Sequence, residues 1–173
     1  MPLTGRGGSQ PLPRSEAVME VLPLYLAEDG ITLVLLGDLS IEVGWHASLH
    51  PSDAACEVVN EFGLAPIVAH STSWRHRPGT LIVSYAVIVE PPATLAPMLR
   101  VRVVGRSALS RGSATRAPTV IAVDQVVEHA LRHLSWLREE DDAVRTALPA
   151  GWADALAPYP PEPFRPFEGP WDE

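Results

Sequence analysis

The sequence predicts a mixed β-sheet sandwiched between helices, a fold of the α/β or α+β class. The order of apolar segments is the first reason: a strand pair, one short helix, a second strand pair, a further strand and two helices at the end. Composition is the second, because 173 residues that are 46% hydrophobic and 20% charged supply one packed core of typical domain size. We therefore expect one globular domain.

The first strand pair is expected at residues 17–26 and 31–36, both rich in leucine and β-branched residues. The sequence Glu-Asp-Gly at 28–30 between them suits a tight hairpin turn. A polar stretch with glycine follows at residues 37–50, and we expect a loop there.

A short helix is expected next. Ser52 and Asp53 are residues that cap helix N-termini, and Gly63 suits the C-terminal stop of a helix that runs to Phe62.

The second half of the chain continues the pattern. Strands are expected at 67–74 and 80–89 around a His-Arg-Pro-Gly turn, and a short strand at 99–104. Apolar residues at helical spacing predict a long helix over 124–137, and a short helix is expected over 141–148.

Three zones differ in composition. Residues 1–16 are expected to be a disordered leader, residues 17–148 carry the periodic apolar pattern, and residues 149–173 form a tail with seven of the eighteen prolines. This tail also holds five aromatic residues: Trp152, Tyr159, Phe164, Phe167 and Trp171. Because exposed aromatic side chains are unfavourable in water, we expect the tail to wrap over the core rather than dock onto a partner.

The predicted short helix carries a stripe of carboxylates. Asp53, Glu57 and Glu61 follow one another at intervals of four and therefore share one helix face. Such a stripe is either a solvated acidic face or a set of oxygen ligands for a hard cation such as Mg²⁺.

The residues around this stripe resemble the Nudix hydrolase family. Residues 56–64 read Cys-Glu-Val-Val-Asn-Glu-Phe-Gly-Leu, and the family's box ends in Arg-Glu-apolar-x-Glu-Glu-x-Gly-apolar. Both outer glutamates, the glycine and the apolar positions are kept, whereas the arginine becomes Cys56 and the middle glutamate becomes Asn60. Upstream, the family's glycine and glutamate fall on Glu42 and Ser48, so the box at 42–64 is degenerate.

The resemblance implies a Nudix-like α/β/α sandwich with a long C-terminal helix and a proline-rich tail. It implies a hydrolase of a nucleoside-diphosphate-linked compound, with Glu57 and Glu61 as catalytic residues and as ligands of Mg²⁺ or Mn²⁺. Loss of one catalytic base typically costs 10²–10⁴-fold in rate, and His50, His46 and Asp53 are candidates to replace it. The alternative is a catalytically inactive module that binds a nucleotide-like small molecule or a protein.

An acid-free stretch between Glu90 and Asp124 contains five arginines: Arg100, Arg102, Arg106, Arg111 and Arg116. Arg100 and Arg102 alternate on a predicted strand and so share a face, from which they could bind substrate phosphate. They could equally pair with the acidic residues at 138–173. Trp74 lies beside arginines and either stacks a nucleobase or plugs the end of a core strand, and the plug is the favoured interpretation.

Histidines stand four residues apart on the long predicted helix. His129 and His133 share a face with Arg132 and Trp136. This spacing suits zinc, but the sequence suggests no third ligand, so a polar face or a subunit contact is favoured. We accordingly expect a homodimer through the helix at 124–137.

Charge and residue usage exclude several classes of protein. The net charge of −8 makes binding to nucleic acid unfavourable for the chain as a whole. All thirteen basic residues are arginine, which excludes Schiff-base chemistry and a P-loop lysine. No apolar run is long enough to cross a membrane, and a single cysteine suits a reducing compartment, so a cytoplasmic location is expected.

Overall fold

The computed structural model describes residues 16–45, 49–109 and 120–162. Its strands are β1 (Glu16–Ala27), β2 (Gly30–Leu36), β3 (Ile41–Gly44), β4 (Pro66–Arg77), β5 (Thr80–Val89) and β6 (Leu99–Val103). Its helices are α1 (Pro51–Glu61), α2 (Val123–Glu140), α3 (Asp142–Ala147) and α4 (Trp152–Leu156).

The six strands form one mixed sheet in the order β4-β5-β1-β2-β6, with β3 added on β1. Strand β1 runs parallel to β5, whereas β1–β2, β1–β3, β2–β6 and β4–β5 are antiparallel. β1 is long enough to pair with β3 through its first half and with β2 through its second half. The mixed sheet that the sequence predicts is confirmed.

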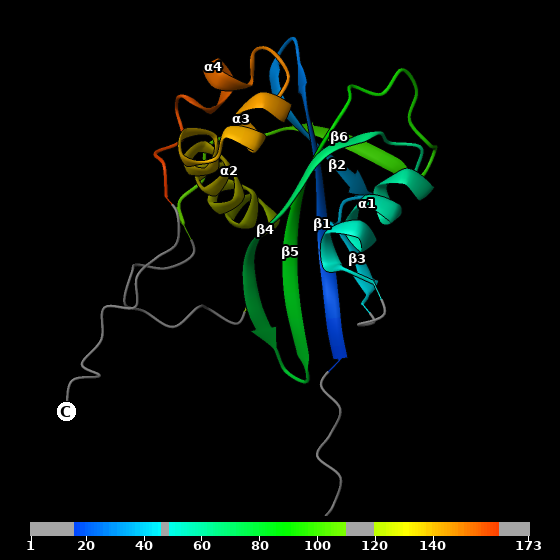
Figure 1. Ribbon diagram of the computed structural model, residues 1–173. Coiled ribbons are helices and arrows are strands. Elements are labelled where there is room, and N and C mark those ends of the chain that lie inside the picture. The colour runs from blue at the N-terminus through cyan, green and yellow to red at the C-terminus, as the bar shows by residue number, and fades with distance from the viewer. Residues whose placement is uncertain (1–15, 46–48, 110–119, 163–173) are drawn as a thin grey trace, which may run out of the picture.

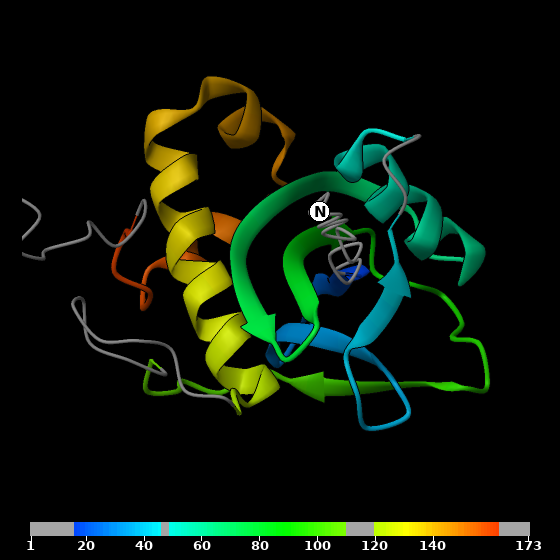
Figure 2. The same ribbon diagram turned by 90° about the horizontal axis from the view of Figure 1, so that it is seen from below.

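Helices cover both faces of this sheet (Figure 1). Leu22, Leu24 and Ala86 pack with α2 and α4 on one face. Met19 and Val21, which alternate with them along β1, pack with α1 on the other face. Figure 2 shows α2 and α1 on opposite sides of the curved β4–β5 hairpin. The molecule is therefore an α/β/α sandwich, as the sequence predicts.

The start of the proline-rich tail packs on the α2 side of the core. Trp152 and Leu156 of α4 and Tyr159 beyond it are all buried among residues of the sheet and α2. These contacts agree with a tail that wraps over the core, and residues 163–173 lie outside the described residues.

Most predicted elements occur within a few residues of their expected positions, with three differences. Ile41–Gly44, expected as loop, is strand β3, and α4 was not predicted. The N-cap of α1 is His50 rather than Ser52 or Asp53: the His50 Nδ1 accepts a hydrogen bond from the Ser52 backbone N–H at 3.3 Å. Gly63 ends α1 as expected, with a left-handed φ of 75° that glycine adopts without strain.

Candidate functional site

The structure places a cavity of about 450 Å³ on the α2 face of the sheet, beside the N-terminus of α2. Its polar lining comes from β1, β3, β4 and the loop before β3, and its apolar lining includes residues from β5 and the segment that enters α2. The lining residues are Glu20, Asp38, Leu39, Ser40, Glu42, Arg75, His76, Arg77, Ile82, Val120, Ile121 and Val123.

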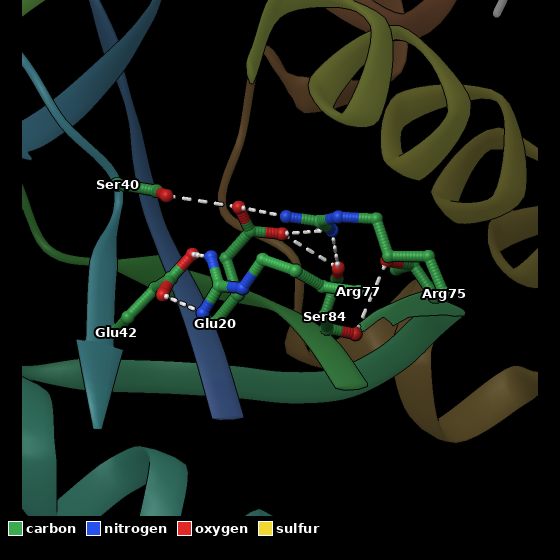
Figure 3. A network of polar contacts seen from close by, with 7 residues as sticks. Glu20, Ser40, Glu42, Arg75, Arg77 and Ser84 are labelled. Atoms are coloured by element: carbon green, nitrogen blue, oxygen red, sulfur yellow. Dashed lines mark hydrogen bonds and ion pairs between the residues drawn. The ribbon is translucent and has the colours of Figure 1, made fainter. Parts of the chain in front are cut away.

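A buried carboxylate forms the floor of this cavity. Glu20 is 1% exposed and accepts hydrogen bonds on both of its carboxylate oxygens (Figure 3). Arg75 donates from Nη1 to Oε2 at 2.6 Å and from Nη2 to Oε1 at 2.8 Å. The hydroxyls of Ser84 and Ser40 donate to Oε2 at 2.7 Å and to Oε1 at 2.8 Å. Such complete pairing is what allows a carboxylate to stay charged out of water.

These contacts shift the protonation of Glu20. Burial alone would raise the pKa of this carboxyl group, but the hydrogen bonds and charge of Arg75, with help from both serine hydroxyls, outweigh burial and lower its pKa. Glu20 is therefore a carboxylate at neutral pH and its lone pairs are already used, so its role is to hold Arg75 in place.

A β-bulge aims Arg75 at this carboxylate. The β4–β5 register shifts between Ser71 and Ser73, so that Thr72 is an extra residue in β4. Beyond such an extra residue, each side chain of the strand lies on the opposite face of the sheet from the one it would otherwise occupy. Arg75 therefore points toward α2 and Glu20, and Trp74 points to the opposite face.

A second ion pair stands at the mouth of the cavity. Arg77 donates to both carboxylate oxygens of Glu42, at 3.0 and 3.3 Å, from side chains that are 49% and 31% exposed. Glu42 lies directly opposite Glu20 in the β1–β3 register, so each of the two neighbouring carboxylates has its own arginine (Figure 3). The hydrogen bonds of Arg77 raise the pKa of its guanidinium, which stays charged.

The two glutamates predicted to bind metal lie on the other face of the sheet. Glu57 and Glu61 are both exposed on α1, whose buried side packs against the face opposite the cavity. Neither lines the cavity described above. Within the described ranges, no group of three or more histidine, cysteine, aspartate or glutamate side chains is placed to hold a metal ion.

Arg100 and Arg102 share one face of β6, as predicted, because they pair with Leu35 and Leu33 of β2. That face is the one covered by α2, so the structure does not bring these arginines together with Glu57 and Glu61. Arg100 donates to the carbonyl oxygens of Pro97 and Leu99, and Arg102 forms an ion pair with Asp124 of α2.

Pairing with the acidic C-terminal residues, one of the two alternatives for the arginine stretch, is not observed for its described members Arg102 and Arg106. Arg102 and Arg106 pair with Asp124 and Glu128 at the start of α2, rather than with acidic residues of the chain after residue 137. Arg111 and Arg116 lie outside the described residues.

The favoured interpretation of Trp74 as a core plug was also wrong, because its side chain is 72% exposed. The bulge at Thr72 explains the difference, since it places Trp74 opposite Val83 on the α1 face and beyond the cover of the helix. Trp74 thus shares a face of the sheet with α1 and not with the cavity.

The polar side of α2 contacts the rest of the same chain. His129 Nε2 lies 3.2 Å from the Thr72 carbonyl oxygen, and His133 Nε2 lies 3.2 Å from His70 Nε2. Arg132 bonds to Glu128 and forms a longer ion pair with Glu162 at 3.4 Å. The side chains that suggested a subunit interface are therefore engaged within the chain, and a homodimer through this helix stays a prediction.

Glu128 is a second buried carboxylate that the sequence did not single out. It is fully buried and accepts hydrogen bonds from Arg106 at 2.8 and 3.0 Å, from Arg132 at 2.9 Å and from the Ser107 backbone N–H at 3.1 Å. Burial would raise its pKa, but these donors lower it to about 2. Arg106 also lies over the Tyr159 ring at 4.7 Å, so this cluster fastens the C-terminal segment to α2.

A signal for the cavity floor was present in the sequence. Glu20 is the one charged residue between Ala17 and Leu26, in a strand otherwise composed of apolar residues and proline. Lone carboxylates in buried strands are retained only when they are paired. Its partner Arg75 was not recognisable, because the bulge that orients it leaves no mark in the alternation of β4.

Comparisons with known proteins give little further guidance. No family model matches the chain, and no curated protein matches it. Among solved structures, a candidate member of the nudix hydrolase family from Chromobacterium violaceum is 18% identical, with 84% of this chain and 98% of that chain covered and a TM-score of 0.45. The C-terminal domain of mouse MUTYH, in complex with human PCNA, is 15% identical, with 52% and 74% covered and a TM-score of 0.38. Both scores are low, and neither likeness establishes an activity.

No described helix is both long enough and apolar enough to cross a membrane.

Proposed function

We propose that this protein is a Nudix-like module that binds a small nucleotide-like ligand in the cavity on the α2 face, without catalysis by the α1 carboxylates. The observation that carries this proposal is the position of the cavity. It holds two arginine–carboxylate pairs, and it lies across the sheet from Glu57 and Glu61. A ligand in the cavity would therefore be bound without a metal held by α1.

Arg77 is the group best suited to bind a phosphate. Its pair with Glu42 is partly exposed, and exposed ion pairs contribute little to stability. Arg77 can therefore turn from Glu42 toward a phosphate at the mouth of the cavity, and the planar guanidinium fits two phosphate oxygens at once. Arg75 is less available, because it is fixed on the buried Glu20.

The cavity also offers a surface for the apolar part of a nucleotide. Ile82, Ile121 and Val123 line it on the side of β5 and α2. Small-molecule sites typically combine such apolar walls with a few polar groups that fix orientation. Glu42, once released from Arg77, can accept hydrogen bonds from ribose hydroxyls or an exocyclic amine.

A thermal-shift titration tests this proposal. ADP-ribose and ADP are added to the full chain in EDTA and again in Mg²⁺, and we expect both to raise the melting temperature independently of metal. Arg77→Gln should weaken binding about 10–100-fold, the usual contribution of a charge-assisted contact. Arg145→Gln is the matched control, because Arg145 is 51% exposed and pairs with Asp142 of α3. Equal binding by the two variants would contradict the proposal.

A metal-dependent hydrolase is the second candidate. The observation in its favour is that Glu57 and Glu61 are both accessible on one face of α1, where Mg²⁺ or Mn²⁺ could bind them together with a substrate phosphate and water. The exposed ring of Trp74 lies on the same side of the sheet and could stack a nucleobase. Arg100 and Arg102 would contact substrate only from the opposite face.

Turnover of ADP-ribose or a dinucleotide in Mg²⁺ or Mn²⁺ distinguishes the two candidates. The hydrolase requires metal-dependent product that is lost in Glu57→Gln and in Glu61→Gln. Glu140→Gln is the matched control, because Glu140 is an exposed carboxylate at the end of α2, on the other face of the sheet. For the binding module we expect no turnover in any of these proteins.

A further inference from the structure

Two histidines from different elements meet where β4 packs against α2. His70 Nε2 lies 3.2 Å from His133 Nε2, and the ring centroids are 5.2 Å apart with an angle of 20° between the planes. Two nitrogens bound to one tetrahedral zinc ion at about 2.0–2.1 Å lie about 3.3–3.4 Å from each other. We propose that His70 and His133 form a binding site for a divalent transition-metal ion of the zinc class.

The contact that His133 Nδ1 makes with a backbone carbonyl leaves Nε2, which contacts His70 Nε2, as the nitrogen that can bind metal. Its Nδ1 lies 3.3 Å from the backbone carbonyl oxygen of Glu162, which can only accept a hydrogen bond. The ring proton therefore sits on Nδ1, and the Nε2 lone pair points toward His70. Histidine ligands of metals commonly have their second ring nitrogen fixed by a carbonyl or carboxylate in this way.

The packing around the two rings holds them in place. The two rings are half-buried, and Trp136 lies against His133 with ring centroids 5.5 Å apart. Both ligands thus come from packed elements whose positions are set before metal binds.

The ligand type selects the ion. Imidazole nitrogen suits Zn²⁺, Ni²⁺ and Cu²⁺, whereas Mg²⁺ and Ca²⁺ require oxygen ligands. Two histidines leave two positions of a tetrahedral ion for water. An ion bound here would link β4 to α2, and since the unfolded chain lacks this arrangement, binding would stabilise the folded state. This site is separate from the cavity and does not depend on the function proposed for it.

A metal titration on the tag-free full chain, freed of metal with EDTA and dialysed, tests the site. ZnCl₂ at about one hundred times its Kd should raise the melting temperature by about 5–10 °C, and calorimetry should give one ion per chain. His70→Ala and His133→Ala should each weaken zinc binding by at least about 10–100-fold. The control His129→Gln alters a histidine of the same helix that contacts the Thr72 carbonyl oxygen instead, and it should bind zinc normally.

The absorption spectrum of Co²⁺ keeps the test valid if an alanine variant folds poorly. Co²⁺ in a tetrahedral site absorbs strongly in the visible range, and the wild-type spectrum should be lost in the conservative variant His133→Asn. A zinc effect of equal size in all variants would overturn the proposal by placing the ion elsewhere. The absence of any zinc effect would also overturn it, and the contact would then be an N–H···N hydrogen bond alone.

Discussion

Replacing Arg75 by methionine tests whether this arginine stabilises the buried carboxylate of Glu20. The change keeps much of the side-chain volume but leaves Glu20, 2% exposed in its side chain, with only the hydroxyls of Ser40 and Ser84 as donors. Breaking a buried ion pair from one side typically costs about 3–5 kcal/mol. Arg75 itself is 16% exposed, so water screens part of this loss and we expect about 3 kcal/mol in the free energy of unfolding at pH 7. Urea denaturation of the two proteins measures it.

The loss in the free energy of unfolding should also depend on pH. In the wild type the pKa of Glu20 is lowered, so its contribution is complete above the unfolded pKa of about 4.5 and is lost as the pH falls through the folded pKa. Without Arg75, burial dominates and raises the pKa of Glu20, so the folded variant takes up a proton and gains stability as the pH falls from 7 to 5. The difference in the free energy of unfolding between the wild type and the variant should therefore shrink between pH 7 and pH 5. A stability difference below about 1 kcal/mol, or one that is equal at both pH values, would show that Arg75 does not stabilise the charged form of Glu20.

Three further substitutions test other parts of the structure. Glu128→Gln should lower the free energy of unfolding by about 3 kcal/mol at pH 7. The pKa of the native carboxylate is lowered to about 2, so it stabilises the fold above pH 4.5 and loses this effect as the pH falls toward 2. The variant should therefore lose less stability than the wild type between pH 7 and pH 2.5, and unfolding free energies at these two pH values measure both effects. Gly151→Ala should cost about 1–3 kcal/mol, since Gly151 has φ of 90° and an added Cβ would lie 2.9 Å from Leu26 Cδ2; an unchanged melting temperature would contradict this geometry. Trp152→Ala should cost about 3–5 kcal/mol if the start of the tail is part of the core, as its 1% exposure indicates, and a chemical denaturation curve that matches the wild type would show that it is not.

The regular elements could be predicted because their signals are local. The turn at 28–30 and the glycine at the end of α1 occur at the expected places, since hairpin and cap preferences depend on a few adjacent residues. The amphipathic pattern of α2 likewise marks the face that packs on the sheet. The cap of α1 was misassigned because the histidine before Pro51 can accept the same hydrogen bond as a serine or aspartate.

The candidate site could not be predicted, because it depends on contacts between distant segments. The pairing of Glu20 with Arg75 joins residues 55 positions apart and requires a bulge at Thr72. Without that bulge, the Trp74 side chain would lie on the α2 face of the sheet, and this is why we expected it to be buried. The spacing of Glu57 and Glu61 placed them together on a helix, but the face of the sheet against which that helix packs is set by the tertiary structure.

Amide chemical-shift mapping with ADP-ribose in EDTA shows which face of the sheet binds the ligand. If the ligand binds in the cavity on the α2 side, the largest shifts occur at Glu42, Arg77 and Ile82. Shifts centred on Glu57, Glu61 and Trp74, or shifts that require Mg²⁺, would contradict binding in the cavity.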